Sequence, residues 1–144
     1  MDLTYSSLCH FLDKVCLLYT SDAADDFFTG MFETALEEDE IIESISFSKP
    51  AKANYVKFPN PASRYAMVGV FVAQFADEVR VAVTGAGEGG VFRHQEMESV
   101  LSSNFSADSL SSVNIDSDGL ISDLHASAEY RANLIKEMTK RAIV

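Results

Sequence analysis

The strongest constraint on the fold is a nearly uninterrupted apolar run at residues 65–73, YAMVGVFVA. Both alternating sets of positions are apolar, so a strand formed here is covered on both faces. A second run, VRVAVTG, follows after a short polar connection, which favours an antiparallel hairpin. Before the first run, Tyr55–Phe58 forms another extended piece, which Pro59 and Pro61 interrupt. The three strands predict a meander.

The segment before this meander shows two further periodicities. Residues 25–36, DDFFTGMFETAL, space apolar side chains three to four apart and predict a short amphipathic helix or helical turn. Residues 41–47, IIESISF, alternate and predict a half-buried strand that ends at Pro50. The four consecutive acids at 37–40 lack the glycine-centred spacing of a calcium loop, so we expect a solvated turn.

The second half of the chain has helical spacing. HQEMESVLSSN predicts a helix, and SADSLSSV predicts a short capped one. In SAEYRANLIKEMTKRAI an apolar residue recurs every four positions, with an acid in the first turn and bases in the last, as the helix dipole prefers. Strands followed by helices predict an α+β fold, in which an antiparallel sheet of three to four strands packs against a layer of about three helices.

Composition limits the function. A chain of 144 residues suits one compact domain, and a net charge of -11 disfavours binding to nucleic acid or to an anionic membrane. No apolar segment approaches the roughly 20 residues that a membrane span needs, so we expect a cytoplasmic protein. Cys9 and Cys16, with no later cysteine, are predicted to be reduced thiols.

The glycine-rich segment GAGEGG, residues 85–90, matches the G-x-G-x-x-G pattern of dinucleotide-binding loops. Two interpretations are possible, a phosphate cradle or a flexible loop from sheet to helix. Glu88 would place a negative charge inside a cradle, and no strand with a ribose-binding acid follows. The pattern therefore favours the flexible loop.

Other chemistry has little support in the sequence. His10, His94 and His125 have no metal-ligand spacing, and we expect surface or capping roles for them. No serine lies in a glycine elbow, so no catalytic residue is predicted.

Tyr55 and Lys57 share one face of their strand, and Gly69 allows a backbone or a ligand to approach the next strand closely. Composition alone favours a structural interpretation, in which Tyr55 is core while Lys57 and Arg64 extend to solvent at the rim of the sheet.

At these residues the chain resembles a known family. YVKFPNPASRYAMVGVFVA, VRVAVTGAG, RHQEMESVL and DLHASAEYRANLIKEMTKRAI are similar to the C-terminal domain of the FAD-binding medium subunit of molybdenum hydroxylases. The likeness is to the aerobic carbon monoxide dehydrogenase type, with xanthine dehydrogenase more distant, and it runs over residues 24–144.

The resemblance implies that this chain helps to form a flavin site within a multisubunit oxidoreductase, with Tyr55 and Lys57 at the flavin edge, and is not catalytic alone. FAD would be held mostly by an N-terminal domain that has no counterpart here. The molybdenum cofactor would lie in a large partner subunit and the iron–sulfur clusters in a small one. Electrons would pass through the clusters to the flavin and on to an external acceptor.

Two expectations remain open. Residues 1–23 do not match the family and are similar to translated adapter sequence, which predicts a truncated fragment with a foreign or disordered leader. The alternative function is a small acidic interaction or scaffold domain that binds no flavin.

Overall fold

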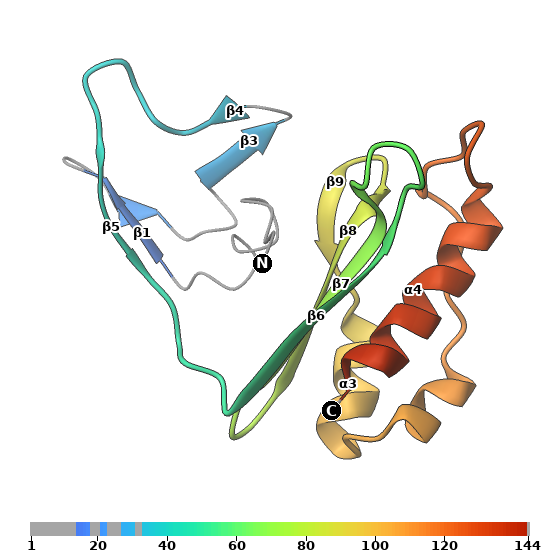
Figure 1. The fold of residues 1–144 in the computed structure, drawn as a ribbon. Helices are drawn as coiled ribbons and strands as arrows, with labels where there is room; N and C mark the ends of the chain where they lie inside the picture. The colour runs from blue at the N-terminus through green and yellow to red at the C-terminus, as the bar shows by residue number, and fades with distance from the viewer. Residues whose placement is uncertain (1–13, 18–20, 23–26, 31–32, 144) are drawn as a thin grey trace. The chain divides into compact units, whose positions relative to one another are not determined.

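The computed structural model describes residues 14–17, 21–22, 27–30 and 33–143. The chain divides into two compact units, Met1–Lys49 and Pro50–Val144 (Figure 1), and each is described by itself. This division does not coincide with the domain boundary expected at residue 24, which stays a prediction.

The second unit contains a four-stranded antiparallel sheet in the order β6-β7-β8-β9. Every strand therefore neighbours the next one in the chain, which confirms the predicted meander. The fourth strand, β9, was not identified in the sequence because it is short and follows directly on the glycine-rich segment. The strands are β6 (Lys52–Pro59), β7 (Ala66–Gln74), β8 (Val79–Gly87) and β9 (Gly90–Arg93).

Three helices cover one face of this sheet, as the sequence predicted (Figure 1). Each is N-capped by a side chain that accepts a hydrogen bond from a backbone N–H of the first turn, and these caps are His94, Ser106 and Ser127. No helix in the described part of the chain is long and apolar enough to cross a membrane. The helices are α3 (Gln95–Ser103), the 3-10 helix η1 (Ala107–Ser112) and α4 (Ala128–Ala142).

The core of this unit lies between the sheet and the helices. One alternating set of strand positions supplies valines that are almost completely buried, among them Val70, Val81 and Val83. From the helices come side chains such as Ile135 and Met138, in the stripe expected for the last helix. Burial of these aliphatic side chains accounts for the stable face-to-face packing of sheet and helices.

The described part of the first unit consists of short strands. A three-stranded sheet has the order β2-β1-β5, with β2 antiparallel to β1 and β1 antiparallel to β5, and a two-stranded one pairs β3 with β4. The strands are β1 (Lys14–Leu17), β2 (Ser21–Asp22), β3 (Phe28–Gly30), β4 (Glu33–Thr34) and β5 (Ile42–Ser46).

Two predictions for this unit were wrong. The helix expected at 25–36 is replaced, in its described residues, by β3 and β4, which are antiparallel and in which Gly30 pairs with Glu33. Phenylalanine and threonine favour strands and glycine weakens helices, so strand pairing outweighs the apolar spacing. The strand expected at 41–47 forms as β5, but all of its residues are exposed rather than half-buried. Among the described residues of this unit, no second layer covers it.

Candidate functional site

The candidate site lies on the face of the second unit's sheet that is opposite the helices. Tyr55 of β6 pairs with Phe71 of β7, and Lys57 pairs with Gly69. Gly69 pairs in turn with Thr84 of β8. Because residues two apart in a strand share a face, the register brings Tyr55 and Lys57 together on this side, as predicted.

Gly69 makes room for the Tyr55 side chain. A Cβ atom at position 69 would collide with the Tyr55 hydroxyl oxygen and would lie 2.9 Å from Tyr55 Cζ and 2.7 Å from Thr84 Cγ2. The phenol therefore extends diagonally across the glycine toward Thr84, and its hydroxyl oxygen is buried. The close approach expected at Gly69 is thus made by a tyrosine of the neighbouring strand, and the Tyr55 ring is fixed on the sheet.

Lys57 has a different environment. It lies beside Tyr55 on the same face and is half-buried, and no ion pair of Lys57 is found among the described residues. An ammonium group carries three hydrogen-bond donors on a flexible stem. Lys57 can therefore offer a cation and donors to a group that approaches this face.

Arg64 lies in the loop between β6 and β7 and is exposed. Asn60 organises this loop, because its side-chain oxygen accepts hydrogen bonds from the N–H groups of Ala62 and Ser63, at 2.9 and 3.2 Å. The Arg64 backbone has a φ of 65°, an uncommon conformation for a residue other than glycine. Arg64 is thus a turn residue, in agreement with a structural role.

Arg131, at the start of α4, fastens the helix to the sheet. Its Nη1 donates to the carbonyl oxygens of Met67 and Gly85, at 2.6 and 3.1 Å, and its Nη2 pairs with Asp123 at 2.8 Å. Backbone hydrogen bonds from His125 and Ala126, together with the Arg131 charge, lower the pKa of Asp123. The arginine side chain is almost completely buried, so this contact is structural rather than a ligand site.

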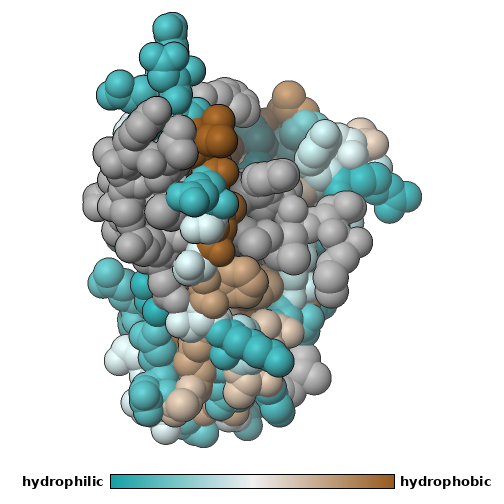
Figure 2. All heavy atoms as spheres, turned by 90° about the vertical axis from the view of Figure 1, so that its left-hand side faces the viewer, coloured by the Kyte–Doolittle hydropathy of each residue, from teal (hydrophilic) through white to brown (hydrophobic). Residues whose placement is uncertain are grey.

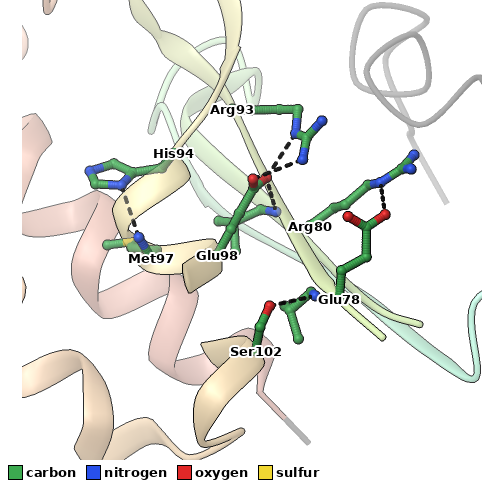
Figure 3. A network of polar contacts seen from close by, with 9 residues as sticks. Glu78, Arg80, Arg93, His94, Met97, Glu98 and Ser102 are labelled. Carbon is green, nitrogen blue, oxygen red and sulfur yellow. Dashed lines mark hydrogen bonds and ion pairs between the residues drawn. The ribbon is translucent and has the colours of Figure 1, made fainter. Parts of the chain in front are cut away.

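A second polar network joins α3 to β8 and β9 (Figure 3). Glu98 accepts two hydrogen bonds from the Arg93 guanidinium, both at 2.8 Å, and one from the backbone N–H of Val81 at 2.9 Å. One helical turn later, the Ser102 hydroxyl accepts the N–H of Val79 at 2.9 Å. Helix α3 thus accepts hydrogen bonds from backbone N–H groups of β8 beyond the end of β9. Arg93 and Glu98 therefore have a structural role in joining α3 to the sheet.

Comparison with known proteins identifies the relationship. The chain is 37% identical, over 131 residues, to the nicotine 6-hydroxylase medium subunit of Paenarthrobacter nicotinovorans. This match covers 84% of the chain and 46% of that protein. The chain is related to hydroxylase medium subunits. The resemblance to the medium subunits of molybdenum hydroxylases is thereby confirmed.

A solved structure has the same fold as this chain. The chain of quinoline 2-oxidoreductase from Pseudomonas putida 86 superposes with a TM-score of 0.70 at 21% identity, over 94% of this chain and 52% of that one. The medium-subunit relative spans about twice the length of this chain, as does the solved chain. No family model matches the sequence.

The glycine-rich segment of this chain, residues 85–90, is part of a hairpin. Residues up to Gly87 belong to β8 and residues from Gly90 belong to β9, so the expected loop from sheet to helix was wrong. Gly85 has a φ of 77°, and a Cβ there would collide with the Ala66 carbonyl oxygen. The Glu88 N–H donates to Gly119 O at 3.0 Å. The segment is therefore a hairpin turn, and this geometry gives no support to a phosphate cradle.

The described histidines have the roles that the sequence indicated. His94 caps α3, with its Nδ1 accepting the Met97 N–H at 3.3 Å, and burial lowers its pKa. His125 is exposed in the turn before α4. His10 and Cys9 lie outside the described residues. Within the described ranges, no three histidine, cysteine or acidic side chains are grouped to hold a metal ion.

Proposed function

We propose that residues 24–144 are the C-terminal domain of the FAD-containing medium subunit of a molybdenum hydroxylase. In this role the domain helps to form a flavin site that receives electrons from iron–sulfur clusters and passes them to an external acceptor. The observation that carries the proposal is the 37% identity to a nicotine 6-hydroxylase medium subunit. The carbon monoxide dehydrogenase type is the finer assignment, and it rests on the sequence motifs alone.

The residues on the helix-free face fit one edge of a flavin. Gly69 and Thr84 hold Tyr55 against the sheet, so its ring is a fixed apolar surface. Lys57 lies two residues further along the same strand with donors available. A fixed ring beside a cation suits the planar, carbonyl-bearing isoalloxazine system.

The described residues provide few groups that could bind the pyrophosphate of FAD. A pyrophosphate needs several backbone N–H groups converging on it. The one glycine-rich segment is a hairpin turn in which the Glu88 N–H bonds to Gly119 O, and Gly85 O accepts from Arg131. This agrees with FAD being held mostly by another domain, while Tyr55 and Lys57 border the flavin.

When bound, the flavin would supply the electron-accepting and electron-donating chemistry. The role of this chain is then to orient the ring system and to exclude water from one side of it. Lys57 would donate a hydrogen bond to a flavin oxygen or nitrogen, and its positive charge would stabilise a reduced, negatively charged ring. The molybdenum cofactor and the iron–sulfur clusters would belong to a large and a small partner subunit.

The test uses a complete medium subunit that contains this domain. Replacing Lys57 by methionine keeps the length of the side chain and removes the charge. We expect a lower flavin reduction potential and slower electron transfer to the acceptor. Lys52→Met, in the same strand but with the opposite alternation, is the matched control.

Unchanged flavin content, potential and electron-transfer rate in the Lys57 variant would remove this residue from the site. Genes for a molybdenum-binding large subunit and a two-cluster iron–sulfur subunit beside this gene would support the wider proposal. Their absence, together with no flavin in the complete protein, would favour the acidic scaffold domain instead.

A further inference from the structure

Large apolar side chains are exposed in both units of the chain. In the first unit they include four residues from Ile41 to Phe47, and Figure 2 shows a narrow hydrophobic band on the side on which Figure 1 draws β5. The described part of the second unit exposes three, which are Tyr65, Leu124 and Tyr130, at 74%, 90% and 45%. These three come from different parts of the sequence, so the tertiary fold decides whether they meet.

The Arg131 guanidinium holds them at one end of the second unit. It donates hydrogen bonds to Met67 O and to the Asp123 carboxylate. Each of the three exposed residues lies within two positions of one of the residues that this guanidinium joins. The β6–β7 loop and the start of α4 therefore lie at the same end of the unit (Figure 1). We call this end the loop-end surface and define it by four residues, namely Arg64, Tyr65, Leu124 and Tyr130.

The β6–β7 loop presents Arg64 in a fixed conformation. The Asn60 N–H donates to Tyr65 O at 2.8 Å, and the Asn60 side chain accepts two further backbone hydrogen bonds. The φ of 65° at Arg64 is one that glycine or asparagine adopts at lower cost. The Arg64 side chain is exposed, and it forms no ion pair within the described ranges. Arginine and tyrosine are enriched among the residues that contribute most to protein interfaces.

Charge distinguishes between possible occupants of this surface. Residues 50–76, which include β6, the loop and β7, contain three basic residues and no acidic one. Residues 77–144 contain six basic residues and 11 acidic ones. An acidic protein is therefore attracted to this hairpin and repelled by the rest of the unit. A second copy of the chain would bring the same basic loop against this one, which like charges oppose.

We propose that the loop-end surface docks an acidic electron-carrier protein, which is the external acceptor. This inference rests on the proposed function, to which it adds a partner. Lys57, at the proposed flavin edge, lies two residues before Pro59, where β6 ends and the loop begins, so a protein bound here lies next to that edge. Two carrier molecules would each take one electron from a reduced flavin, whose protons go to the solvent. Contacts of electron carriers are small, as suits a surface of a few side chains.

The first experiment needs no flavin. This chain, isotope-labelled for NMR, is titrated with plant plastocyanin, an acidic blue-copper protein, at about 0.1 M ionic strength, where charges more than roughly 10 Å away are screened. We expect saturable shift changes centred on residues 59–66, Leu124 and Tyr130. Arg64→Gln and Tyr65→Ser should each raise the dissociation constant about fivefold. Arg141→Gln, at an exposed base in the last turn of α4, is the control and should not.

A matched ligand tests the role of charge. A plastocyanin whose surface acids are replaced by amides should bind about tenfold more weakly. No saturable binding, equal binding of the two plastocyanins, or shift changes centred elsewhere would overturn the proposal. So would a dimer that Tyr65→Ser dissociates, because the occupant would then be a second copy.

The second experiment uses the complete flavin-containing complex, reduced with one equivalent of dithionite. Arg64→Gln should slow flavin reoxidation by plastocyanin about fivefold and leave reoxidation by a small uncharged quinone unchanged. Equal slowing with both acceptors would make this end an internal contact of the complex and would overturn the docking. Because binding to the flavin-free chain is measured separately, the docking proposal and the role of Lys57 can fail independently.

Discussion

Strands β5 (IESIS) and β7 (AMVGVFVAQ) both contain β-branched residues, but β5 intersperses apolar with polar positions, and the two strands have opposite environments. The five residues of β5 are all exposed, while Val68, Val70 and Val72 of β7 are almost completely buried. Strand β7 has a neighbour on each edge and helices on one face, whereas β5 has one neighbour among the described strands. Side-chain chemistry predicts that a strand forms, but the elements around it decide whether the strand contributes to stability. Substitutions that separate these two contributions test this comparison.

The largest effect is expected for Arg131→Leu. This change removes three hydrogen bonds that fasten α4 to β7, β8 and Asp123, and it leaves two carbonyl groups without these donors. We expect the free energy of unfolding of the second unit to fall by about 3 kcal/mol. Urea denaturation followed by circular dichroism measures this value. Arg141→Leu, exposed at the end of the same helix, is the control, and an equal loss there would refute the assignment.

Glu98→Leu should have the next largest effect. The substitution leaves the Arg93 guanidinium without its carboxylate and the Val81 N–H without its acceptor. A loss of about 2 kcal/mol in the same measurement is expected. Glu96→Leu, two residues earlier in the same helix and exposed, is the matched variant and should change stability little.

Gly69→Ala tests whether the packing of Tyr55 is as tight as the geometry indicates. The new methyl group would force Tyr55 and Thr84 to move, and we expect a loss of about 1–3 kcal/mol from overpacking. Adding Tyr55→Leu should recover part of this loss, because the smaller side chain vacates the space. Strictly additive effects of the two substitutions would mean that Tyr55 does not occupy the position.

His94 should make stability depend on pH. Burial lowers its pKa in the folded chain from 6.5, so the unfolded chain binds a proton that the folded chain does not accept. The stabilisation is therefore present above about pH 6.5 and is lost as the pH falls below that value. His94→Asn keeps a capping side chain and should flatten this dependence, whereas His125→Asn should not. A slope that survives in the His94 variant would assign it to another group.

The smallest effect is expected in β5. Ile45→Ser removes an exposed side chain, and the free energy of unfolding of the first unit, to which β5 belongs, should change by less than about 0.5 kcal/mol. Val70→Ser, in the buried strand, should by contrast cost several kcal/mol, because a hydroxyl replaces a completely buried side chain. Comparable losses for the two variants would show that β5 and β7 do not differ in their contribution to stability.

Much of the second unit could be predicted from local patterns. The run at 65–73 is apolar on both alternations and the last helix has a regular stripe, so these elements depend on nearby residues. The glycine-rich segment, by contrast, is a hairpin turn between β8 and β9 and not the expected loop from sheet to helix. The Arg131 and Glu98 contacts join residues far apart or on different elements, and single-sequence patterns do not encode such pairings. The burial predicted for β5 was wrong for a related reason. Alternation predicts which side chains share a face of the strand, but not whether another element covers that face.

The candidate site, too, could be predicted only in part from local patterns. The sequence placed Tyr55 and Lys57 on one face, and the register confirms this. It did not reveal that Tyr55 occupies the space above Gly69, because that contact depends on the pairing of two strands. The sequence signal that could have indicated this contact is the glycine at position 69, which pairs with Lys57 and lies diagonally across from Tyr55.

The donors of β8 that bond to α3 have one further consequence. The amide hydrogens of Val79 and Val81 are held by Ser102 and Glu98, so their exchange with deuterium in solvent requires α3 to detach. Their protection factors would therefore follow the opening of a helix, although the two residues belong to a strand. Exchange measured residue by residue would then report the detachment of α3 separately from the unzipping of the sheet.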